Sequence, residues 1–538
     1  MLSGKKRGLK PRSQRNRKRP RGGVGIFEPD GTYTASNVQV DILPLCYPPN
    51  DKICHERIHV IRPYPFVFST FAKARWIGKT VLDVFVTEFG SYPVLYYQTA
   101  IKEGQILVSG KRVNCDYKIK GQDELSHTVH RHEPAVRIAD SESSSLESKP
   151  YIQIIHEDEE IIVVDKPSTV PVHPCGSYHF NSMFHILVRQ DESLGGKLYN
   201  VHRLDRLTSG LTIIAKSTEV AKTLGKCIMN RDGCHKVYLA RVKGKFPLNA
   251  NNDIRLEKEL EPCVNGEWRS DKKTNGDELV DSSLGDTEAA TCIWITNGQD
   301  KVLYDATFQH VFNRNVNIDE MNPDGSFGHD VLWFNLAIPC DIIDHKHGIC
   351  KAGSGKAAQT AFAVLGYDHE TDTTVVIAKP LTGRTHQIRL HLEFLGHPIA
   401  NDPCYGGELY YGDKNGKIMC EQVLEKMNEL DEDFDITERP PNATSSDMPA
   451  TEKEILSIST FSKKDNESME EYIQRCCVWC KRSKGQDRSI LEFLSRCNGI
   501  WLHAFQYSLD GPKGRLSYKT NLPPWVPAFK SVLKTNKI

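Results

Sequence analysis

An aspartate flanked by two arginines is the pattern in this sequence that most directly suggests chemistry. Asp205 lies between Arg203 and Arg206 in the run Val201–Leu211, which contains a Ser-Gly pair that we expect to form a turn. The apolar, β-branched segment Leu211–Ala215 follows, so we expect the aspartate on a loop that enters a buried strand. Rigid scaffolds commonly hold reactive groups on such loops, and nearby cations favour an ionised carboxylate. The simpler alternative is a structural Arg-Asp ion pair.

The whole run resembles the active-site motif of the RluA-type RNA pseudouridine synthases, in which a single aspartate is catalytic. Further segments resemble other motifs of that family and occur in the family's order along the chain. These segments are Lys236–Gly244, Lys379–Leu392, Leu395–Asp402 with Tyr405–Gly407, and Leu502–Ala504. Several blocks in one order are far more specific than any single block, so we interpret the chain as an enzyme of this type.

The resemblance implies roles for three residues of the catalytic centre. Asp205 is expected to be the nucleophile, and attack on the ribose or on the uracil ring both remain open. A carboxylate in a dry pocket needs a cation beside it, and the family position of that cation corresponds to Arg389. Tyr238 corresponds to the tyrosine that stacks on the target base and assists proton transfer. A tyrosine in such an apolar strand is otherwise simply a core residue.

The resemblance also implies residues that contact RNA. A base inside helical RNA must be flipped out, and Arg203 corresponds to the arginine that takes its place in the stack. Leu502 is expected to form an apolar wall below the base, and Arg384 and His386 to contact the backbone. Arg206 and Lys236 complete this expected set of RNA and base contacts.

The segment before the catalytic body predicts a basic RNA-binding unit. Lys79–Val86 and Tyr96–Lys102 have helical apolar spacing, and Gln105–Val113 turns through a Ser-Gly pair, which indicates helix, helix and hairpin. This order resembles the alpha-L RNA-binding motif. Basic residues of the unit that we expect to contact phosphates are Arg75, Lys79, Lys111 and Arg112.

We therefore predict an α+β fold with a mixed, mostly antiparallel central sheet, flanking helices and a small N-terminal α/β RNA-binding module. The expected units are a disordered basic tail (1–30), an irregular segment (31–61), the RNA-binding module (62–133), a linker (134–150), the catalytic domain (151–411, with insertions at about 250–335), an acidic, mobile insertion (412–475) and the C-terminal part of the catalytic domain (476–538).

Cofactor and metal signals are weak in this sequence, and we expect neither. Uridine isomerisation needs no redox partner, and Gly353–Lys356 lacks the remaining residues of a phosphate loop. The histidine-rich segment Ser126–Pro134 resembles a link to the catalytic domain in eukaryotic members and invites a metal reading. We reject that reading because no matching Cys/His cluster stands out elsewhere. Cys477 and Cys480 form at most half of a zinc site.

Composition narrows the partners of the chain. Its 538 residues carry 69 basic and 69 acidic side chains, and the charges are segregated: the first 21 residues are rich in Lys and Arg and contain no Asp or Glu. Such a tail suggests a nuclear address or an RNA arm, less readily a mitochondrial presequence, and otherwise a solvated tail without a dedicated role. The sequence has no apolar run long enough to span a membrane and no apolar signal core, so we expect an intracellular protein in the cytoplasm or nucleus. We also expect a monomer. We expect RNA as substrate, with tRNA around the anticodon stem-loop first and rRNA or mRNA second. A non-catalytic RNA chaperone is the alternative class.

Overall fold

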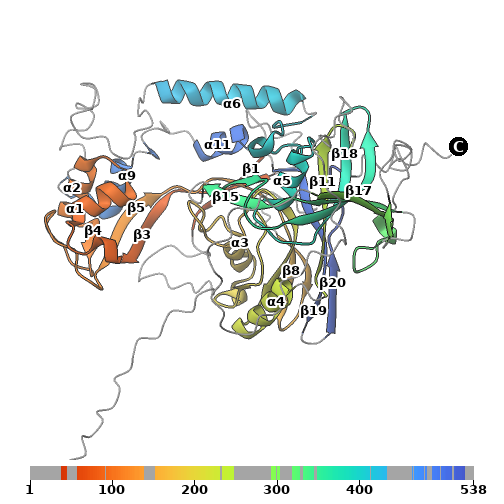
Figure 1. Ribbon diagram of the computed structural model, residues 1–538. Helices are drawn as coiled ribbons and strands as arrows, with labels where there is room; N and C mark the ends of the chain where they lie inside the picture. The colour runs from red at the N-terminus through yellow and green to blue at the C-terminus, as the bar shows by residue number, and fades with distance from the viewer. Residues whose placement is uncertain are drawn as a thin grey trace, which may run out of the picture.

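The computed structural model places a large sheet on one side of the molecule and a small α/β unit on the other (Figure 1). The residues that it describes are 38–44, 57–90, 92–138, 152–230, 233–246, 292–297, 300–302, 318–326, 331–344, 348–411, 414–432, 463–464, 466–477, 479–480, 488–496, 499–511 and 514–526. The predicted basic tail (1–30) lies outside them. None of the helices in these ranges is long and apolar enough to cross a membrane.

A twelve-stranded sheet forms the catalytic body, in the order β13-β12-β14-β17-β18-β11-β19-β10-β8-β7, with β20 beside β19 and β9 beside β10. Its pairs are antiparallel except for β10 and β19, which run parallel. The predicted mixed, mostly antiparallel α+β class is therefore confirmed. The strands are β7 (Gln153–Glu157), β8 (Ile161–Lys166), β9 (Tyr199–Asn200), β10 (Ser209–Ala215), β11 (His235–Lys243), β12 (Cys292–Asn297), β13 (Asp300–Val302), β14 (Leu332–Ala337), β17 (Gln359–Asp368), β18 (Thr373–Pro380), β19 (Leu502–Gly511) and β20 (Gly514–Lys519).

Both faces of this sheet are apolar, because alternate residues of each strand point to opposite sides. On β11, Val237 and Leu239 pack in one cluster with Trp333 and Phe505. Ala240 packs on the other face with Phe362 and Leu502. The helices of the body are α3 (Met183–Gln190), α4 (Thr218–Asn230) and α5 (Gln387–Phe394), and a small hairpin of β15 (Cys340–Asp344) and β16 (Ile349–Ala352) lies beside α5. The strands that carry the predicted motifs are thus central and rigid.

The small unit, which we call the front module (residues 64–131), differs from the predicted helix, helix and hairpin. It begins with a strand that the sequence did not predict, β3 (Tyr64–Phe71), followed by α1 (Val81–Val84), a π-helical turn (Phe85–Phe89), α2 (Val94–Glu103) and β4 (Ile106–Val108). Strand β4 pairs with β5 (Glu124–Arg131), in a sheet of order β3-β5-β4. Residues expected to form a link to the catalytic domain are therefore the central strand of the module.

A third sheet joins the two parts, in the order β1-β2-β6. Its strands are β1 (Val40–Pro44), β2 (Arg57–Ile61) and β6 (Val136–Ile138). Strands β1 and β2 fall in the segment expected to be irregular, and β6 falls in the expected linker. Apolar residues of β2 pack against helices α6 (Lys414–Glu432) and α11 (Arg488–Arg496), which lie above this sheet in Figure 1.

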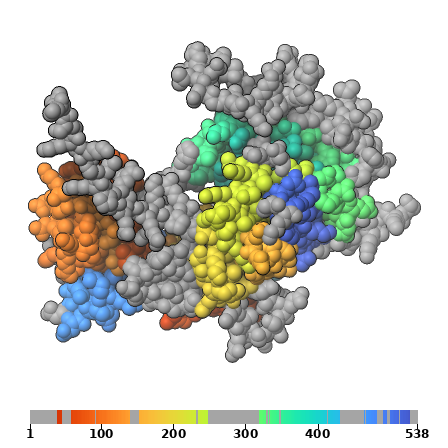
Figure 2. Space-filling model, turned by 90° about the horizontal axis from the view of Figure 1, so that it is seen from below, coloured from red at the N-terminus to blue at the C-terminus, as the bar shows by residue number. Residues whose placement is uncertain are grey.

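The predicted boundary at residue 476 cuts through a packed segment. Helix α9 (Met469–Cys476) belongs to the expected acidic insertion, yet its Tyr472 and Cys476 lie in the apolar core of the front module with Trp76 and Phe85. Figure 2 shows these light-blue residues directly against the orange module. The tertiary structure therefore assigns this part of the C-terminal region to the front module.

The Ser-Gly pair after the catalytic motif is the start of a strand and not a turn. Gly210 has a φ of +112°, and its backbone runs against Ala504 in the parallel pairing of β10 with β19. A Cβ atom at this position would overlap the backbone amide and carbonyl of Ala504. The motif thus needs glycine here for two reasons, backbone conformation and close approach.

We expect Gly210→Ala to destabilise the protein by about 3 kcal/mol or more, because strain and overlap with backbone atoms add. Urea unfolding followed by circular dichroism measures the change. Gly225→Ala on α4 is the matched control, since a Cβ there meets no atom closer than 3.9 Å. We expect it to change stability by less than about 1 kcal/mol. Equal effects of both substitutions would contradict the close-approach explanation.

Candidate active site

Asp205 lies on the loop between β9 and β10, as the sequence predicted. Its backbone carbonyl accepts a hydrogen bond from the Thr208 amide at 3.1 Å, which closes a turn. The side chain is 25% exposed, while the strand that follows is buried from Gly210 onward. The carboxylate is therefore held by a rigid element yet remains open to a substrate.

A guanidinium and an imidazole lie close to this carboxylate. Arg389 Nη1 is 3.7 Å from Asp205 Oδ2, and His386 Nε2 is 3.6 Å from the same oxygen. Both residues come from the start of α5, which the fold brings against the catalytic loop. Among the described residues, these two, rather than the sequence neighbours Arg203 and Arg206, form the ion pairs of Asp205.

Arg389 is fixed by a second carboxylate. Its Nε and Nη2 donate to Asp402 at 2.6 and 2.8 Å, and both side chains are almost fully buried. Burial alone would lower the pKa of Arg389, but the hydrogen bonds and charge of Asp402 outweigh it and raise that pKa. The charge of Asp205 adds to this effect. Because Nε and Nη2 bind Asp402, the remaining nitrogen, Nη1, is the one that lies near Asp205.

His386 is positioned through Tyr405 and an unusual backbone conformation. It caps α5 with a φ of +55°, which few residues other than glycine adopt. Its Nδ1 lies 2.7 Å from the Tyr405 hydroxyl, and the same tyrosine ring packs 4.7 Å from the Arg389 guanidinium. Burial lowers the pKa of His386, although Asp205 acts in the opposite direction. A hydroxyl that donates to Nδ1 would leave Nε2–H facing the aspartate.

Tyr238 points from β11 toward a second tyrosine. Its hydroxyl is 2.5 Å from that of Tyr507 on β19, and the Tyr507 ring lies 5.0 Å from that of His202. Burial raises the pKa of Tyr238, with a smaller contribution from the charge of Asp205. The phenol is therefore neutral at ordinary pH, and it lies close enough to Asp205 for the carboxylate charge to raise its pKa. A neutral aromatic ring beside a held carboxylate suits a base-binding site.

Comparisons with known proteins identify the family of this chain. A family model described as RNA pseudouridylate synthase matches residues 160–297 and 344–394, which include Asp205, Tyr238 and Arg389. The yeast tRNA pseudouridine(31) synthase is 31% identical over 86% of this chain and 94% of its own length. The chain belongs to the RNA pseudouridylate synthase family. The RluA-type resemblance of the motifs is thereby confirmed.

Matches with other relatives extend over a smaller share of the relative's length. The yeast mitochondrial tRNA pseudouridine(32) synthase is 29% identical over 86% of this chain and 76% of its own length. Human pseudouridylate synthase RPUSD2 is 32% identical over 66% of this chain, and the chain spans 48% of that relative's length.

The other residues predicted to contact RNA or the base are spread around this synthase site. Arg203 is exposed, and Arg206 packs 5.4 Å from the Tyr178 ring. Lys236 lies 5.3 Å from the Tyr507 ring, which places it beside the tyrosine pair. The structure does not bring every one of them to the carboxylate. Arg384 donates its Nε to the Ala357 carbonyl, and Leu502 is buried in the core.

The predicted phosphate contacts of the front module lie away from the catalytic centre. Lys79, Lys111 and Arg112 are exposed on the module surface. Arg75 is exposed too, but its guanidinium forms a salt bridge with Glu88 at 2.5 Å. Arg75 would have to exchange this partner for a phosphate, so the other three are the better candidates.

Three residues of the site received no role from the sequence. Asp402 and Tyr405 belong to the family-like motif Leu395–Asp402 with Tyr405–Gly407, and this motif was the sequence signal that pointed to them. Lys166 ends β8 and is fully buried, and its Nζ lies within hydrogen-bond distance of the carbonyl oxygens of Pro167, Val170 and Arg206, at 2.9, 2.8 and 3.3 Å. It ties the catalytic loop to the sheet.

One sequence interpretation is wrong in its premise. The metal reading of the histidine-rich segment was rejected because no partner cluster stood out. In the structure, however, His130 and His132 lie beside Cys477 and Cys480, with all four ligand atoms within 4.8 Å of one another. The partners are about 350 residues away in the chain, so no spacing rule could have revealed them. The remaining histidine, His127, is buried beside Tyr96 in the module core.

We expect Asp402→Asn to destabilise the protein by about 3 kcal/mol or more and to lower turnover, because it leaves the buried Arg389 charge without its carboxylate. Urea unfolding and initial rates measure the two effects. Glu408→Gln removes a carboxylate from an exposed pair with Lys417 and is the control. It should cost less than about 1 kcal/mol. A silent Asp402→Asn variant would show that the pair does not hold Arg389.

Lys166 should make stability depend on pH. Burial, together with the charge of Arg206, lowers its pKa from 10.5 to about 7. Between these values the unfolded chain binds a proton that the native protein does not. Stability should therefore rise with pH across this window, by up to about 1.4 kcal/mol per pH unit. Unfolding of the wild type and of Lys166→Met at pH 7 and pH 9 tests this, because the variant should lack that part of the rise. Equal slopes would refute it.

Proposed function

We propose that this protein is an RNA pseudouridine synthase that isomerises a uridine of tRNA in the anticodon stem-loop, with Asp205 as nucleophile. The observation that carries the proposal is the Asp205 carboxylate held 3.7 Å from a buried arginine at the entrance to a core strand. The substrate exposes its base only after flipping, and the partly open carboxylate suits a flipped base.

The reaction breaks the bond between C1′ of the ribose and N1 of uracil and forms a bond from C1′ to C5. N1 gains a proton and C5 loses one, so no electrons or atoms are exchanged with a cofactor. Asp205 as carboxylate forms the transient adduct, and the guanidinium of Arg389 lies 3.7 Å from it. Tyr238 is partly buried, and its ring provides a flat face on which the base can stack. Its hydroxyl can assist the proton transfer.

RNA recognition is divided between the two parts of the molecule. Arg203 is exposed beside the catalytic aspartate and takes the place of the flipped base. Arg206 and Lys236 lie against aromatic rings near the site, and Lys79, Lys111 and Arg112 present charge on the front module. Phosphate contacts on the module would hold the RNA while the body acts on one nucleotide.

Two relatives support the choice of tRNA, because their names describe them as tRNA pseudouridine synthases for positions 31 and 32. Those relatives match 86% of this chain, which includes much more than the catalytic motifs. We propose that the protein acts as a monomer. The protein must be in the compartment that holds its RNA substrate, and we favour the cytoplasm or nucleus. One of the two relatives is named as mitochondrial.

The proposal predicts that Asp205→Asn lowers pseudouridine formation by more than about a thousandfold, because the nucleophile is lost. Affinity for tRNA should stay within about threefold, since Asp205 contributes little to backbone contacts. Mass spectrometry of modified tRNA transcripts measures the product, and fluorescence anisotropy measures binding. The exposed Asp341→Asn is the control.

The result separates chemistry from substrate choice. Substantial turnover by Asp205→Asn would refute the nucleophile, and wild-type binding without any turnover would favour an RNA chaperone. If the wild type modifies rRNA or mRNA fragments but not tRNA, the chemistry stands and the tRNA assignment fails.

A further inference from the structure

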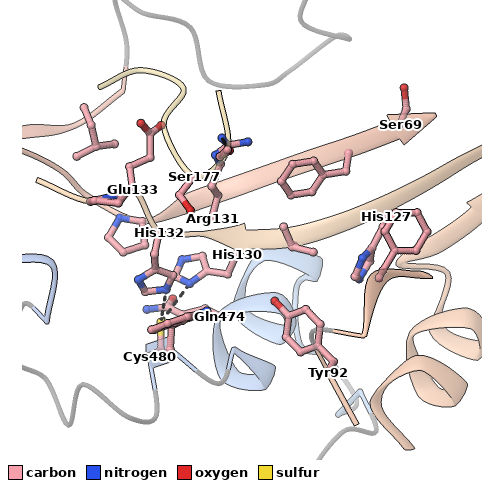
Figure 3. Close-up of a pocket in the computed structure, with 18 of the residues that line it drawn as sticks. Ser69, Tyr92, His127, His130, Arg131, His132, Glu133, Ser177, Gln474 and Cys480 are labelled. Carbon is pink, nitrogen blue, oxygen red and sulfur yellow. Dashed lines mark hydrogen bonds between the residues drawn. The ribbon is translucent and has the colours of Figure 1, made fainter. Parts of the chain in front are cut away.

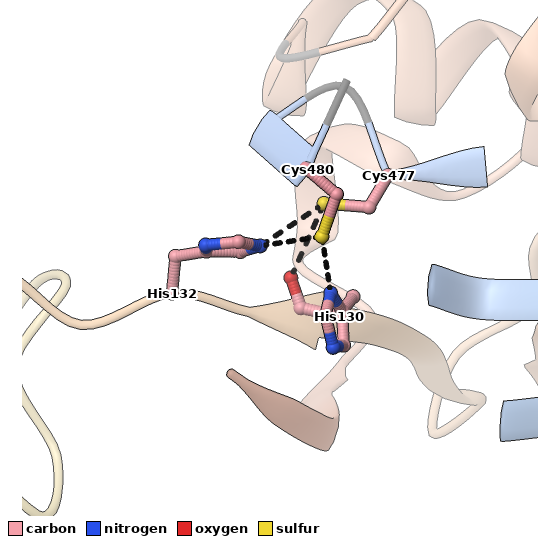
Figure 4. Close-up of side chains that lie close together, drawn as sticks. All are labelled: His130, His132, Cys477 and Cys480. Carbon is pink, nitrogen blue, oxygen red and sulfur yellow. Dashed lines mark hydrogen bonds between the residues drawn. The ribbon is translucent and has the colours of Figure 1, made fainter. Parts of the chain in front are cut away.

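Four side chains from two distant segments converge outside the catalytic site. His130 lies near the end of β5 and His132 directly follows this strand, whereas Cys477 and Cys480 follow α9. His130 Nδ1 is 3.1 Å from Cys480 Sγ, and His132 Nε2 is 3.3 Å from both sulfurs (Figure 4). All four ligand atoms lie within 4.8 Å of one another.

The distances match a shared metal ion. Ligands at the usual zinc bond lengths of about 2.3 Å for sulfur and 2.0 to 2.1 Å for nitrogen lie roughly 3.5 Å apart at a tetrahedral angle. The observed nitrogen-to-sulfur distances fall close to this value. The two imidazole rings are nearly perpendicular, at 88°, so they approach the centre from different directions.

The ligand types select the metal. Two thiolates and two imidazoles in tetrahedral geometry are the ligand set of structural zinc, whereas calcium and magnesium require oxygen ligands. Four protein ligands also fill the coordination shell and leave no position for a reacting water. We propose that His130, His132, Cys477 and Cys480 bind one structural zinc ion. This site is separate from the uridine chemistry and does not depend on the proposed function.

An ion can reach this position. His130 and Cys477 are buried, but His132 and Cys480 are only half buried. His130, His132 and Cys480 line a cavity of about 850 Å³ together with Tyr92, Arg131 and Ser177 (Figure 3). The cluster therefore has a buried half that excludes water and an open half that admits the metal.

The site joins three parts of the molecule. The cysteine segment continues from α9, whose Tyr472 lies in the core of the front module. The histidine segment continues into Glu133, whose carboxylate accepts hydrogen bonds from Tyr64 Oη at 2.6 Å and from the amides of Phe180 and Asn181 at 2.9 and 2.8 Å. Zinc would thus fix α9 to the front module close to the point where this module connects to the catalytic body.

The metal content of the full-length protein, produced without a polyhistidine tag, tests the proposal. Elemental analysis should find one zinc ion per chain in the wild type. Cys480→Ser and His132→Asn should each reduce the content at least tenfold. The matched control is Cys227→Ser on α4, outside the cluster, which should keep the full content.

A second measurement avoids relying on variants that fail to fold. Wild-type protein stripped with a chelator and reloaded with cobalt should show visible d–d bands and a thiolate-to-cobalt charge-transfer band, which zinc then displaces. Chelation should also speed tryptic cleavage at Arg475 on α9 more than tenfold, and zinc should reverse this. Wild-type protein without zinc or cobalt bands, or a Cys477–Cys480 disulfide found by mass spectrometry, would overturn the site.

Discussion

The buried pair of Arg389 and Asp402 is the interaction on which the catalytic centre depends. Its two hydrogen bonds at 2.6 and 2.8 Å fix a guanidinium that is 3% exposed, and the remaining nitrogen faces Asp205. A buried arginine without a carboxylate would be costly, and Asp205 alone cannot serve, because it must stay open to substrate. Two carboxylates therefore share one cation. Asp402 is fully buried with it, whereas Asp205 stays partly exposed, as the nucleophile that we propose must.

The loop that carries Asp205 is also held by Lys166. Its buried amine contacts the backbone carbonyl of Arg206, directly after the aspartate. Gly210 then allows β10 to run close beside β19. Strand β19 carries Tyr507, whose hydroxyl contacts that of Tyr238 on β11. The aspartate is positioned by backbone contacts, whereas the basic groups that face its carboxylate come from α5. This separation lets the loop remain rigid while the carboxylate stays exposed.

The front module is more closely integrated than a tethered RNA-binding unit. Its central strand leads into Glu133, which accepts hydrogen bonds from the module and from the catalytic body. Its core includes Tyr472 from a segment almost 350 residues later in the chain. A module held in this way has a defined orientation relative to the body, which is what the RNA-binding role that we propose for it requires.

The sequence by itself determined the family, the fold class and the place of Asp205 on a loop that enters a core strand. These follow from short motifs and local periodicity, because the residues concerned are neighbours along the chain. It did not determine strands β1 and β3, the pairing of β4 with β5, or the residence of α9 in the module. Strand pairing depends on which apolar faces meet, and a single sequence does not encode this locally. Only the tertiary structure decided that Asp402 and Tyr405 support Arg389 and His386, and that two histidines meet two cysteines. Groups so far apart in the chain become neighbours only when the core between them has packed.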